Sequence, residues 1–192
     1  MNPVFATDEF VVHEATRADV SELQALVEAN PEYWLLTRGQ LPPADFAAQC
    51  FEHYPPADMT YSANLILLVR DARISKLIGQ LDVATDLMIR GVYHLGYFMI
   101  ATQAYGTGLG YRLYKAYERW TLQREARWLR LGVFEANTRA EAFWRRLGYL
   151  ELKRQDNYRF GNLSHTLITM LKPLSGATVD EYLEAVPRDR PS

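Results

Sequence analysis

The sequence predicts a mixed α/β sheet in one domain, and three observations support that prediction. Short apolar runs typical of strands alternate with segments in which apolar residues recur at helical spacing. The 192 residues are 48% hydrophobic and 23% charged, which is the balance of one ordinary globular domain. Neither repeats nor low-complexity tracts interrupt the pattern. The expected domain covers residues 1–174, followed by a tail, 175–192, with a short amphipathic helix.

The N-terminal third is expected to hold one strand and two helices. A β-rich segment, Phe10–His13, precedes Thr16, which can cap a helix together with Asp19 three residues later. Apolar residues then recur at helical spacing until Asn30-Pro31, where the helix is expected to end. A second helix is expected to begin after Pro42-Pro43 and to run to about residue 53.

From residue 64 onwards the sequence is typical of strands separated by two amphipathic helices. Asp71-Ala-Arg73 is a turn between two apolar runs, so these runs are expected to form a hairpin. In the first helix, Leu109, Leu113 and Trp120 fall on one face. The expected strands cover residues 65–70, 77–83, 93–100, 128–134, 149–153 and 167–171, and the expected helices cover 108–123, 138–147 and 179–186.

Several classes of protein are excluded by what the sequence lacks. The longest aliphatic run, Leu65–Val69, is far shorter than the roughly 20 apolar residues that a membrane helix needs. The N-terminal residues lack the basic start and apolar stretch of a signal peptide. The single cysteine, Cys50, cannot form an internal disulfide, and no cluster of cysteine and histidine indicates a metal site. We therefore expect a cytoplasmic protein that binds neither a membrane nor a metal ion.

The net charge of −2 is too small for a general nucleic-acid binder, but the charges are unevenly distributed. Residues 1–60 carry ten acidic and two basic side chains, whereas residues 101–160 carry twelve basic and six acidic ones. One interpretation is that these charges are spread over solvated faces. The other is that the basic region holds a polyanion while the acidic region faces a neutral or cationic ligand.

A glycine-rich loop, Gln103-Ala-Tyr-Gly106-Thr-Gly108-Leu-Gly110, lies between an expected strand and an expected helix. Its glycines can adopt backbone conformations that other residues resist, and they let a ligand approach the chain closely. The first amides of the helix then point at an anion, which the helix dipole also favours. The loop therefore predicts a phosphate site, although a turn that only needs glycines remains an alternative.

Two common phosphate motifs do not fit this loop. A P-loop needs lysine and a hydroxyl residue after its last glycine, where this chain has Tyr111-Arg112. A dinucleotide fingerprint starting at Gly106 needs glycine or alanine at position 111, which is tyrosine. Glu135, at the end of the next strand, does stand where a ribose-binding acid belongs. A Rossmann-type nucleotide-binding domain is thus the less favoured alternative.

The motifs resemble those of the GCN5-related N-acetyltransferases, the GNAT superfamily. Gln103-x-x-Gly106-x-Gly108 is similar to the family's acetyl-CoA motif, and the preceding strand, Leu95–Ile100, is similar to the strand that enters that loop. Downstream, residues Asn137–Tyr149 resemble the second family signature, and His13–Asp19 resembles the first strand and helix start. The resemblance covers about residues 10–172.

This resemblance implies a fold and an activity. The fold is a mixed, mostly antiparallel sheet of six or seven strands flanked by about four helices, with two parallel strands splayed apart at the CoA site. The activity is acetyl-CoA-dependent acetylation of a primary amine (a small amine, a polyamine, an aminoglycoside or a peptide amine) by direct attack in a ternary complex. The alternative within the family is an inactive acyl-CoA-binding regulatory protein. Homodimers are frequent in the family, and the tail after Gly176 could serve one.

The resemblance also implies the donor site. The pyrophosphate is expected on the loop amides and the pantetheine arm between strand residues 98–102 and 131–135, with Arg139, Arg145 or Arg146 near the phosphates. The residues expected to contact acetyl-CoA are Met99, Ile100, Thr102, Tyr105, Gly106, Thr107, Gly108, Leu109, Gly110, Tyr111, Asn137, Phe143, Trp144 and Arg146.

The chemistry requires a base, because an alkyl ammonium with a pKa near 10 must lose a proton before it attacks. Family members place a glutamate on the strand before the glycine loop, where this chain has His94 and Gly96. His94 is the first candidate for the base, since imidazole titrates near neutral pH. Glu135 is the second. A backbone amide near Ile100 is expected to polarise the thioester carbonyl.

One position departs from the family pattern. Many members use a tyrosine to protonate the leaving thiolate where this chain has Trp144, and an indole N–H is not an acid at useful pH. Tyr97, Tyr105 or water are the substitutes to consider. A thiolate with a pKa near 8.5 can also leave without an acid.

The resemblance also implies that the acceptor enters opposite CoA, beneath the loop that joins the first two helices and near the hairpin strands, where acidic and aromatic residues gather. Tyr33, Trp34 and Tyr54 are the candidate contacts, because aromatic faces attract a cationic amine. The alternative is that these rings belong to the core and the acidic side chains to the solvated surface.

Overall fold

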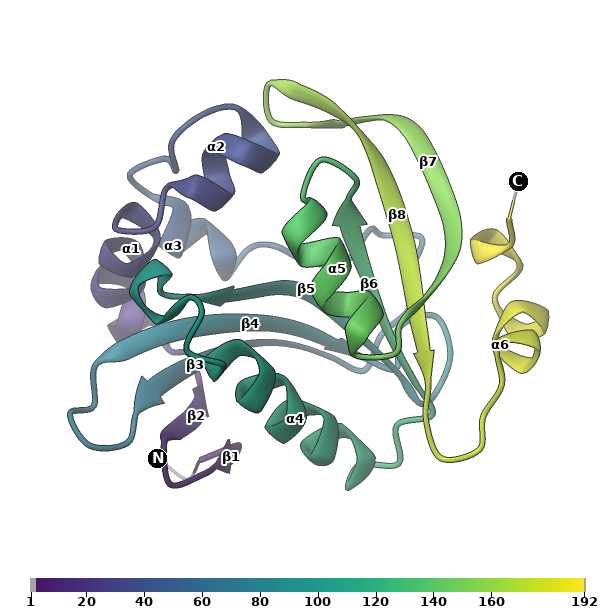
Figure 1. The fold of residues 1–192 in the computed structure, drawn as a ribbon, viewed down its shortest axis with the longest axis horizontal. Coiled ribbons are helices and arrows are strands. Elements are labelled where there is room, and N and C mark those ends of the chain that lie inside the picture. The colour runs from purple at the N-terminus through teal and green to yellow at the C-terminus, as the bar shows by residue number, and fades with distance from the viewer. Residues whose placement is uncertain (1–2, 192) are drawn as a thin grey trace.

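The computed structural model describes residues 3–191 and confirms a mixed α/β fold (Figure 1). The strands are β1 (Phe5–Ala6), β2 (Phe10–Glu14), β3 (Ala63–Asp71), β4 (Leu77–Thr85), β5 (Val92–Ile100), β6 (Trp128–Phe134), β7 (Leu150–Phe160) and β8 (Leu163–Pro173). The helices are α1 (Val20–Glu28), α2 (Glu32–Arg38), α3 (Phe46–Cys50), α4 (Leu109–Leu122), α5 (Thr138–Arg146) and α6 (Val179–Ala185). None of these helices is both long and apolar enough to cross a bilayer.

The strands form one sheet in the order β1-β2-β3-β4-β5-β6-β8-β7. Every neighbouring pair is antiparallel except β5 and β6, which run parallel at the centre. A parallel pair needs a crossover, and α4 supplies it. The eight strands exceed the six or seven expected, because β1 adds a short strand at one edge.

Apolar residues alternate between the two faces of the sheet and so divide the core. Leu67, Val69, Leu129 and Leu131 belong to the cluster that packs under α4 and α5. Their neighbours on the opposite face pack against α1 and α3 at one end and against α6 at the other. In Figure 1, α4 and α5 lie in front of the strands, and α6 lies beside the β7–β8 hairpin. The sheet is therefore covered on both faces.

Helix α2 was not expected from the sequence. It begins after Pro31, an acceptable residue at a helix start, and ends at Gly39, whose φ of +66° is a left-handed cap. Its Trp34 is buried against Phe46 of α3, with ring centroids 4.6 Å apart. Helix α3 is shorter than expected. Burial of Trp34, rather than helical periodicity, stabilises this segment from the α3 side.

The β7–β8 hairpin extends well beyond the two short strands expected, and its tip contacts α2 (Figure 1). The backbone N–H of Asn162 donates to the carbonyl of Arg38 at 2.9 Å. The Arg38 guanidinium lies between the rings of Trp34 and Phe160, 4.6 and 4.1 Å from their centroids. Helix α2 thus connects the β5 side of the sheet to the far hairpin.

Gly161 lies where the hairpin tip contacts α2, so a substitution there tests how close that contact is. Its φ is +60°, and a Cβ atom there would lie 2.7 Å from the Arg38 carbonyl oxygen. Gly176 has a similar φ of +79° with nothing within 4 Å of a Cβ atom. We predict that Gly176→Ala lowers the free energy of unfolding by about 1 kcal/mol through backbone strain alone. Gly161→Ala should lower it by about 3 kcal/mol, because a steric clash adds to the strain.

Chemical denaturation of the two variants, compared with the unchanged protein, measures both values. Equal losses in the two variants would show that the hairpin tip does not depend on contact with α2.

Candidate functional site

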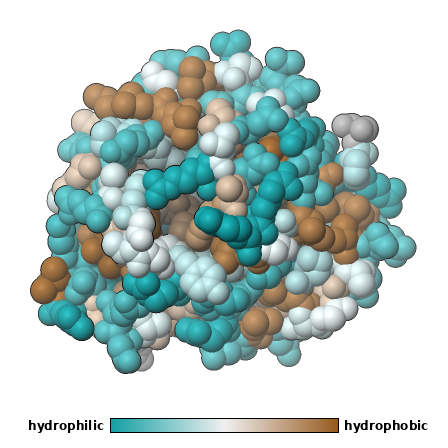
Figure 2. All heavy atoms as spheres, viewed as in Figure 1, coloured by the Kyte–Doolittle hydropathy of each residue, from teal (hydrophilic) through white to brown (hydrophobic). Residues whose placement is uncertain are grey.

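The central feature is a cavity where the parallel strands separate. Pairing between β5 and β6 ends at Leu95 and Leu131, although both strands continue beyond these residues. The opening widens into a cavity of about 590 Å³ that both strands line. Figure 2 shows a hollow in this face of the molecule, with hydrophilic residues along its rim. The splayed strands that the resemblance implies are therefore present in the structure.

The glycine-rich loop forms one end of the cavity. Gly106 and Gly108 have φ values of +77° and +80°, in the left-handed region that favours glycine. Within residues 3–191, the backbone N–H groups of Gly106, Gly108, Gly110 and Tyr111 donate to no acceptor. Unpaired amides at a helix start favour an anion, because the helix dipole adds to their partial positive charge.

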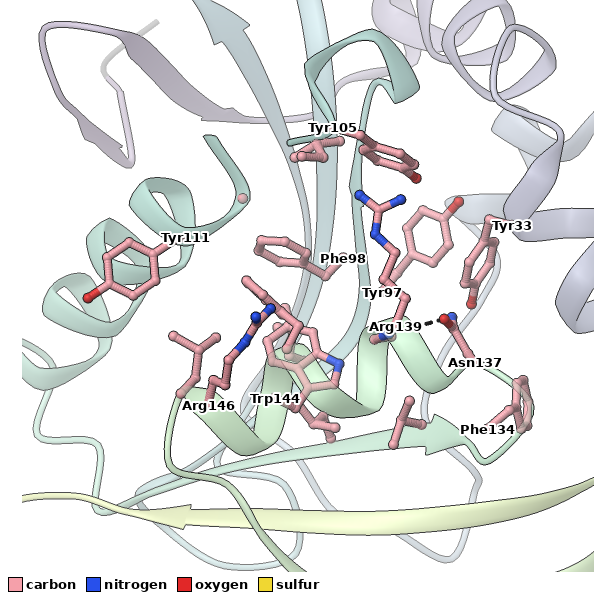
Figure 3. Close-up of a pocket in the computed structure, with 18 of the residues that line it drawn as sticks. Tyr33, Tyr97, Phe98, Tyr105, Tyr111, Phe134, Asn137, Arg139, Trp144 and Arg146 are labelled. Atoms are coloured by element: carbon pink, nitrogen blue, oxygen red, sulfur yellow. Dashed lines mark hydrogen bonds between the residues drawn. The ribbon is translucent and has the colours of Figure 1, made fainter. Parts of the chain in front are cut away.

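Basic and aromatic side chains from α5 surround this end (Figure 3). Arg139 and Arg146 both line the cavity, and the Arg139 guanidinium lies 4.0 Å from the centroid of the Tyr105 ring. Asn137 caps α5, since its side-chain oxygen accepts the N–H of Ala140 at 3.2 Å, and it also lines the cavity. The cavity therefore combines unpaired loop amides, two arginines and a largely apolar wall.

Ten of the residues expected at the donor site line this cavity. They are Ile100, Tyr105, Gly106, Gly108, Gly110, Tyr111, Asn137, Phe143, Trp144 and Arg146.

Four others do not line it. The Met99 side chain packs on the opposite face, in the cluster under α1 and α3. The Thr102 hydroxyl donates to Glu32, and the Thr107 hydroxyl donates to the carbonyl of Ala104. Leu109 is buried in the core under α4.

The other end of the cavity is aromatic. Tyr33 of α2 and Tyr97 of β5 meet edge to face, with ring centroids 5.1 Å apart, and Phe134 of β6 lies across from them (Figure 3). The Tyr97 hydroxyl donates to the Met99 sulfur at 3.3 Å. Burial raises the pKa of Tyr97 well above its usual value, so this hydroxyl keeps its proton.

Two of the three residues expected at the acceptor site lie elsewhere. Trp34 is in the core, where it packs against Phe46, and Tyr54 is exposed on a loop. The acidic side chains of the N-terminal region are also held outside the cavity. Glu52 pairs with Arg17 and Asp58 with Arg188, while several others pair on the outer surface. Of the expected acceptor contacts, only Tyr33 lines the cavity.

Neither residue expected to act as a base lies in the cavity lining. Glu135 is about half exposed and forms an ion pair with Arg154. His94 faces the side of the sheet opposite α4, and its Nδ1 lies 3.2 Å from Nη1 of Arg130. Burial, together with the Arg130 charge, lowers the pKa of His94 to about 3. An imidazole with that pKa is a very weak base, so we do not retain His94 in that role.

The indole of Trp144 is packed in the core and forms part of the cavity wall. It is 7% exposed, and its ring lies edge to face with Phe98, Phe143 and Tyr149. Its position supports packing between α5 and the sheet.

A carboxyl group that the sequence analysis missed lies beside the aromatic end. Asp82 of β4 stands directly opposite Tyr97 in the register of β4 and β5, and it accepts a hydrogen bond from Gln80 at 2.7 Å. Burial raises the pKa of Asp82 to about 6. The signal was present, since two polar residues share one face of an otherwise apolar strand.

Comparison with known proteins identifies the family. A model of the Acetyltransferase (GNAT) family matches residues 23–149, about two thirds of the chain. No curated protein sequence matches the chain.

Several solved structures share the fold. An acetyltransferase from Thermus thermophilus has a TM-score of 0.67 and 23% identity, covering 86% of this chain and 97% of that one. Spermidine N-acetyltransferase from Vibrio cholerae, in complex with CoA and spermine, has a TM-score of 0.67 and 16% identity, covering 87% and 96%. The ribosomal-protein-S18-alanine N-acetyltransferase from Escherichia coli has a TM-score of 0.64 and 15% identity, covering 89% and 97%. At these identities the likeness shows the fold.

The anion end can be tested at Gly106, which lines the cavity and where a Cβ atom would meet nothing within 4 Å. Aspartate and asparagine both tolerate a left-handed φ and have nearly the same shape. We predict that Gly106→Asp weakens CoA binding at least about tenfold more than Gly106→Asn does, because only aspartate repels the phosphates. Isothermal titration with CoA measures this difference. Equal CoA affinities in the two variants would show that the CoA phosphates do not bind at this loop.

Proposed function

The chain belongs to the acetyltransferase (GNAT) family, whose members use acetyl-CoA, and from that premise we propose that it acetylates a small primary amine that carries one positive charge. The observation that carries the proposal is the two-ended cavity. The unpaired loop amides and two arginines suit the phosphates of the donor, and the aromatic end suits the body of an amine.

A single charge on the acceptor is favoured by the cavity lining. Among residues 3–191, the lining contains no aspartate or glutamate, and Arg139 and Arg146 are its charged members. A polyamine or an aminoglycoside carries several ammonium groups, each of which loses hydration on entering and needs a carboxylate partner. Tyr33, Tyr97 and Phe134 offer aromatic faces for an apolar body instead.

A small acceptor is favoured by the way α2 covers the aromatic end. The carbonyl of Thr37 lies 2.8 Å from Nε2 of His165 in β8, and the Gln40 side chain accepts from Asn162 at 3.0 Å. With the Arg38 contacts, these bonds hold α2 against the hairpin. A folded protein would have to displace this connection to present its N-terminus, whereas a small molecule would not.

The proposed reaction is direct transfer. The ammonium form of the amine first releases one proton, and the neutral nitrogen then forms a bond to the thioester carbonyl carbon. As the carbon–sulfur bond breaks, the nitrogen transfers its second proton to the departing sulfur, and CoA leaves as the thiol. The backbone amide near Ile100 would stabilise the oxyanion. The proton released by the amine would pass to Asp82, by way of water because Asp82 lies beside Tyr97 rather than in the lining.

The first test combines a binding measurement with a turnover measurement. We predict that acetyl-CoA raises the midpoint of thermal unfolding, since it binds only the native state, whereas NADH and ATP do not. Thiol release should then appear with single-charge amines such as 2-phenylethylamine and be at least about tenfold faster in kcat/KM than with spermidine or kanamycin.

Each other outcome has a definite meaning. Binding of acetyl-CoA without thiol release from any amine would favour the alternative of an acyl-CoA-binding regulatory protein. Faster turnover of spermidine would contradict the single-charge acceptor. A rise in the unfolding midpoint with NADH but not with acetyl-CoA would contradict acetyl-CoA as the acetyl donor.

The role of Asp82 predicts a pH dependence. A base must be unprotonated to accept the proton, so kcat should rise with pH through about 6 and then level off. Asp82→Asn should lower kcat about 10²-fold and remove this rise. Gln80→Leu, which removes the hydrogen bond to Asp82 but keeps the carboxyl, should shift the midpoint to higher pH. A rise that persists in Asp82→Asn would assign the base elsewhere.

A further inference from the structure

A buried polar cluster joins the C-terminal segment to the strands at the point where they separate. His94 of β5 and Arg130 of β6 are opposite each other in the register, one pair before the last pair of the parallel ladder. Both belong to the face opposite α4, because their neighbours in each strand are buried under α4. The residues that follow the last pair, Gly96 and Gly132, line the cavity.

Arg130 is held by Asp189, which lies in a 3₁₀ helix (Pro187–Asp189) after α6. Its Nε and Nη2 donate to the two carboxylate oxygens at 2.7 and 3.0 Å, and the Tyr182 hydroxyl donates to the same carboxylate at 2.6 Å. The Arg130 and Asp189 side chains are 11% and 5% exposed. A paired, bidentate arginine of this kind has a fixed orientation.

The remaining nitrogen of Arg130 determines the tautomer of His94. Nη1 lies 3.2 Å from Nδ1 of His94, and a guanidinium can only donate. Nδ1 must therefore be the acceptor, which leaves the hydrogen of the neutral ring on Nε2. Asp189, Arg130 and His94 thus form one chain of hydrogen bonds from the C-terminal segment to the centre of the sheet.

The Nε2 edge of His94 lies next to a bare stretch of backbone. A Cβ atom on Gly96 would be 3.8 Å from both Nε2 and Cδ2 of His94, and Gly96 is itself exposed. Within residues 3–191, Nε2 has no hydrogen-bond partner. His94 is not part of the cavity lining, but Gly96 is, and a side chain at position 96 would lie between this edge and the cavity.

We propose that Asp189 is a positioning residue which, through Arg130, fixes His94 as a neutral Nε2–H donor facing the acceptor end of the cavity. The donor would bind an oxygen of the amine substrate, such as a hydroxyl or carbonyl near the amino group. The assignment of an amine as its ligand rests on the proposed function. The tautomer and its dependence on Asp189 do not.

The charges around the ring support a donor that stays neutral. Arg130 faces it from β6, Asp189 and Tyr182 lie behind Arg130, and Ala84 stands opposite it on β4. Burial and the Arg130 charge keep the pKa of His94 far below neutral. Although burial opposes it, Arg130 lowers the pKa of Asp189, so the carboxylate remains charged. The cluster therefore keeps the same protonation across the neutral range.

Nitrogen-15 NMR of the imidazole rings tests the tautomer without any substrate. The chain has four histidines, and His94→Gln assigns the signal. We expect the Nε2–H tautomer in the unchanged protein, with no protonation between pH 5 and 8. Asp189→Asn should mix the two tautomers. The Nδ1–H form in the unchanged protein, or unaltered shifts in Asp189→Asn, would overturn the proposal.

Two further variants separate positioning from folding. Arg130→Met with Asp189→Leu replaces the buried ion pair by apolar side chains, which preserves folding better than removing one partner. It should change the His94 shifts while unfolding cooperatively. Arg188 lies in the same 3₁₀ helix as Asp189 and forms a surface ion pair with Asp58. Arg188→Ala breaks that pair and should leave the nitrogen-15 shifts of His94 unchanged. If Arg188→Ala changed the His94 shifts as much as the double variant does, the effect would reflect a general disturbance of the C-terminal segment, and the proposal would be overturned.

The kinetic test uses two amines that differ in one oxygen-bearing group, phenylalaninol and 2-phenylethylamine. Loss of one neutral hydrogen bond in Asp189→Asn or His94→Asn should raise KM for phenylalaninol up to about tenfold and leave KM for acetyl-CoA within about twofold. His94→Gln, whose amide nitrogen can replace Nε2, should retain most of the affinity. Equal effects on the two amines would overturn the donor role. Failure of both amines as substrates, with the expected NMR result, would contradict the proposed function and the amine ligand but not the tautomer.

Discussion

Strands β5 and β6 exchange backbone hydrogen bonds over only four residue pairs, and the site depends on that short ladder. Beyond Leu95 and Leu131, β5 remains paired with β4 and β6 remains paired with β8, so the sheet divides into two antiparallel halves. The unpaired backbone edges and the two glycines that follow the ladder leave space where side chains would otherwise fill the core. The glycine-rich loop then opens at the end of β5, in line with this gap. The anion end and the aromatic end are consequences of one interruption in pairing.

The uneven charge along the chain has two different physical explanations. On the basic side, Arg139 and Arg146 line the cavity, while others, such as Arg112 with Glu9, form ion pairs. On the acidic side, the carboxylates join elements to one another, as Glu22 does with Arg70 on β3. The net charge of a segment does not show which of its charged side chains form ion pairs with residues elsewhere in the chain. A cluster of acidic residues in sequence is therefore weak evidence for a cation site, because ion pairs between elements far apart in the sequence are invisible there.

Most strands and the position of the glycine-rich loop could be predicted because they depend on local signals. A short apolar run predicted β6 with its observed bounds, and glycines at alternate positions predicted the loop. Helix α2 could not be predicted, since it is stabilised by burial of Trp34 and by contact with a hairpin more than a hundred residues away. The pKa values of His94 and Asp82 depend in the same way on which groups the sheet brings beside them. Local sequence determines what a residue can do, and tertiary neighbours determine its pKa.

The short ladder also has a mechanical meaning. Within each antiparallel half, neighbouring strands such as β4 and β5 or β6 and β8 pair over seven residue pairs, whereas the two halves are joined along a seam by four pairs, the packing of α4 and α5, and the connection through α2. Any molecule that lies along the seam and bonds to both edges acts as a cross-link between the halves. Its binding free energy then adds to the cohesion of the whole molecule, by mass action. The stability of this fold against local opening and proteolysis therefore depends both on the chain and on the molecule bound along the seam.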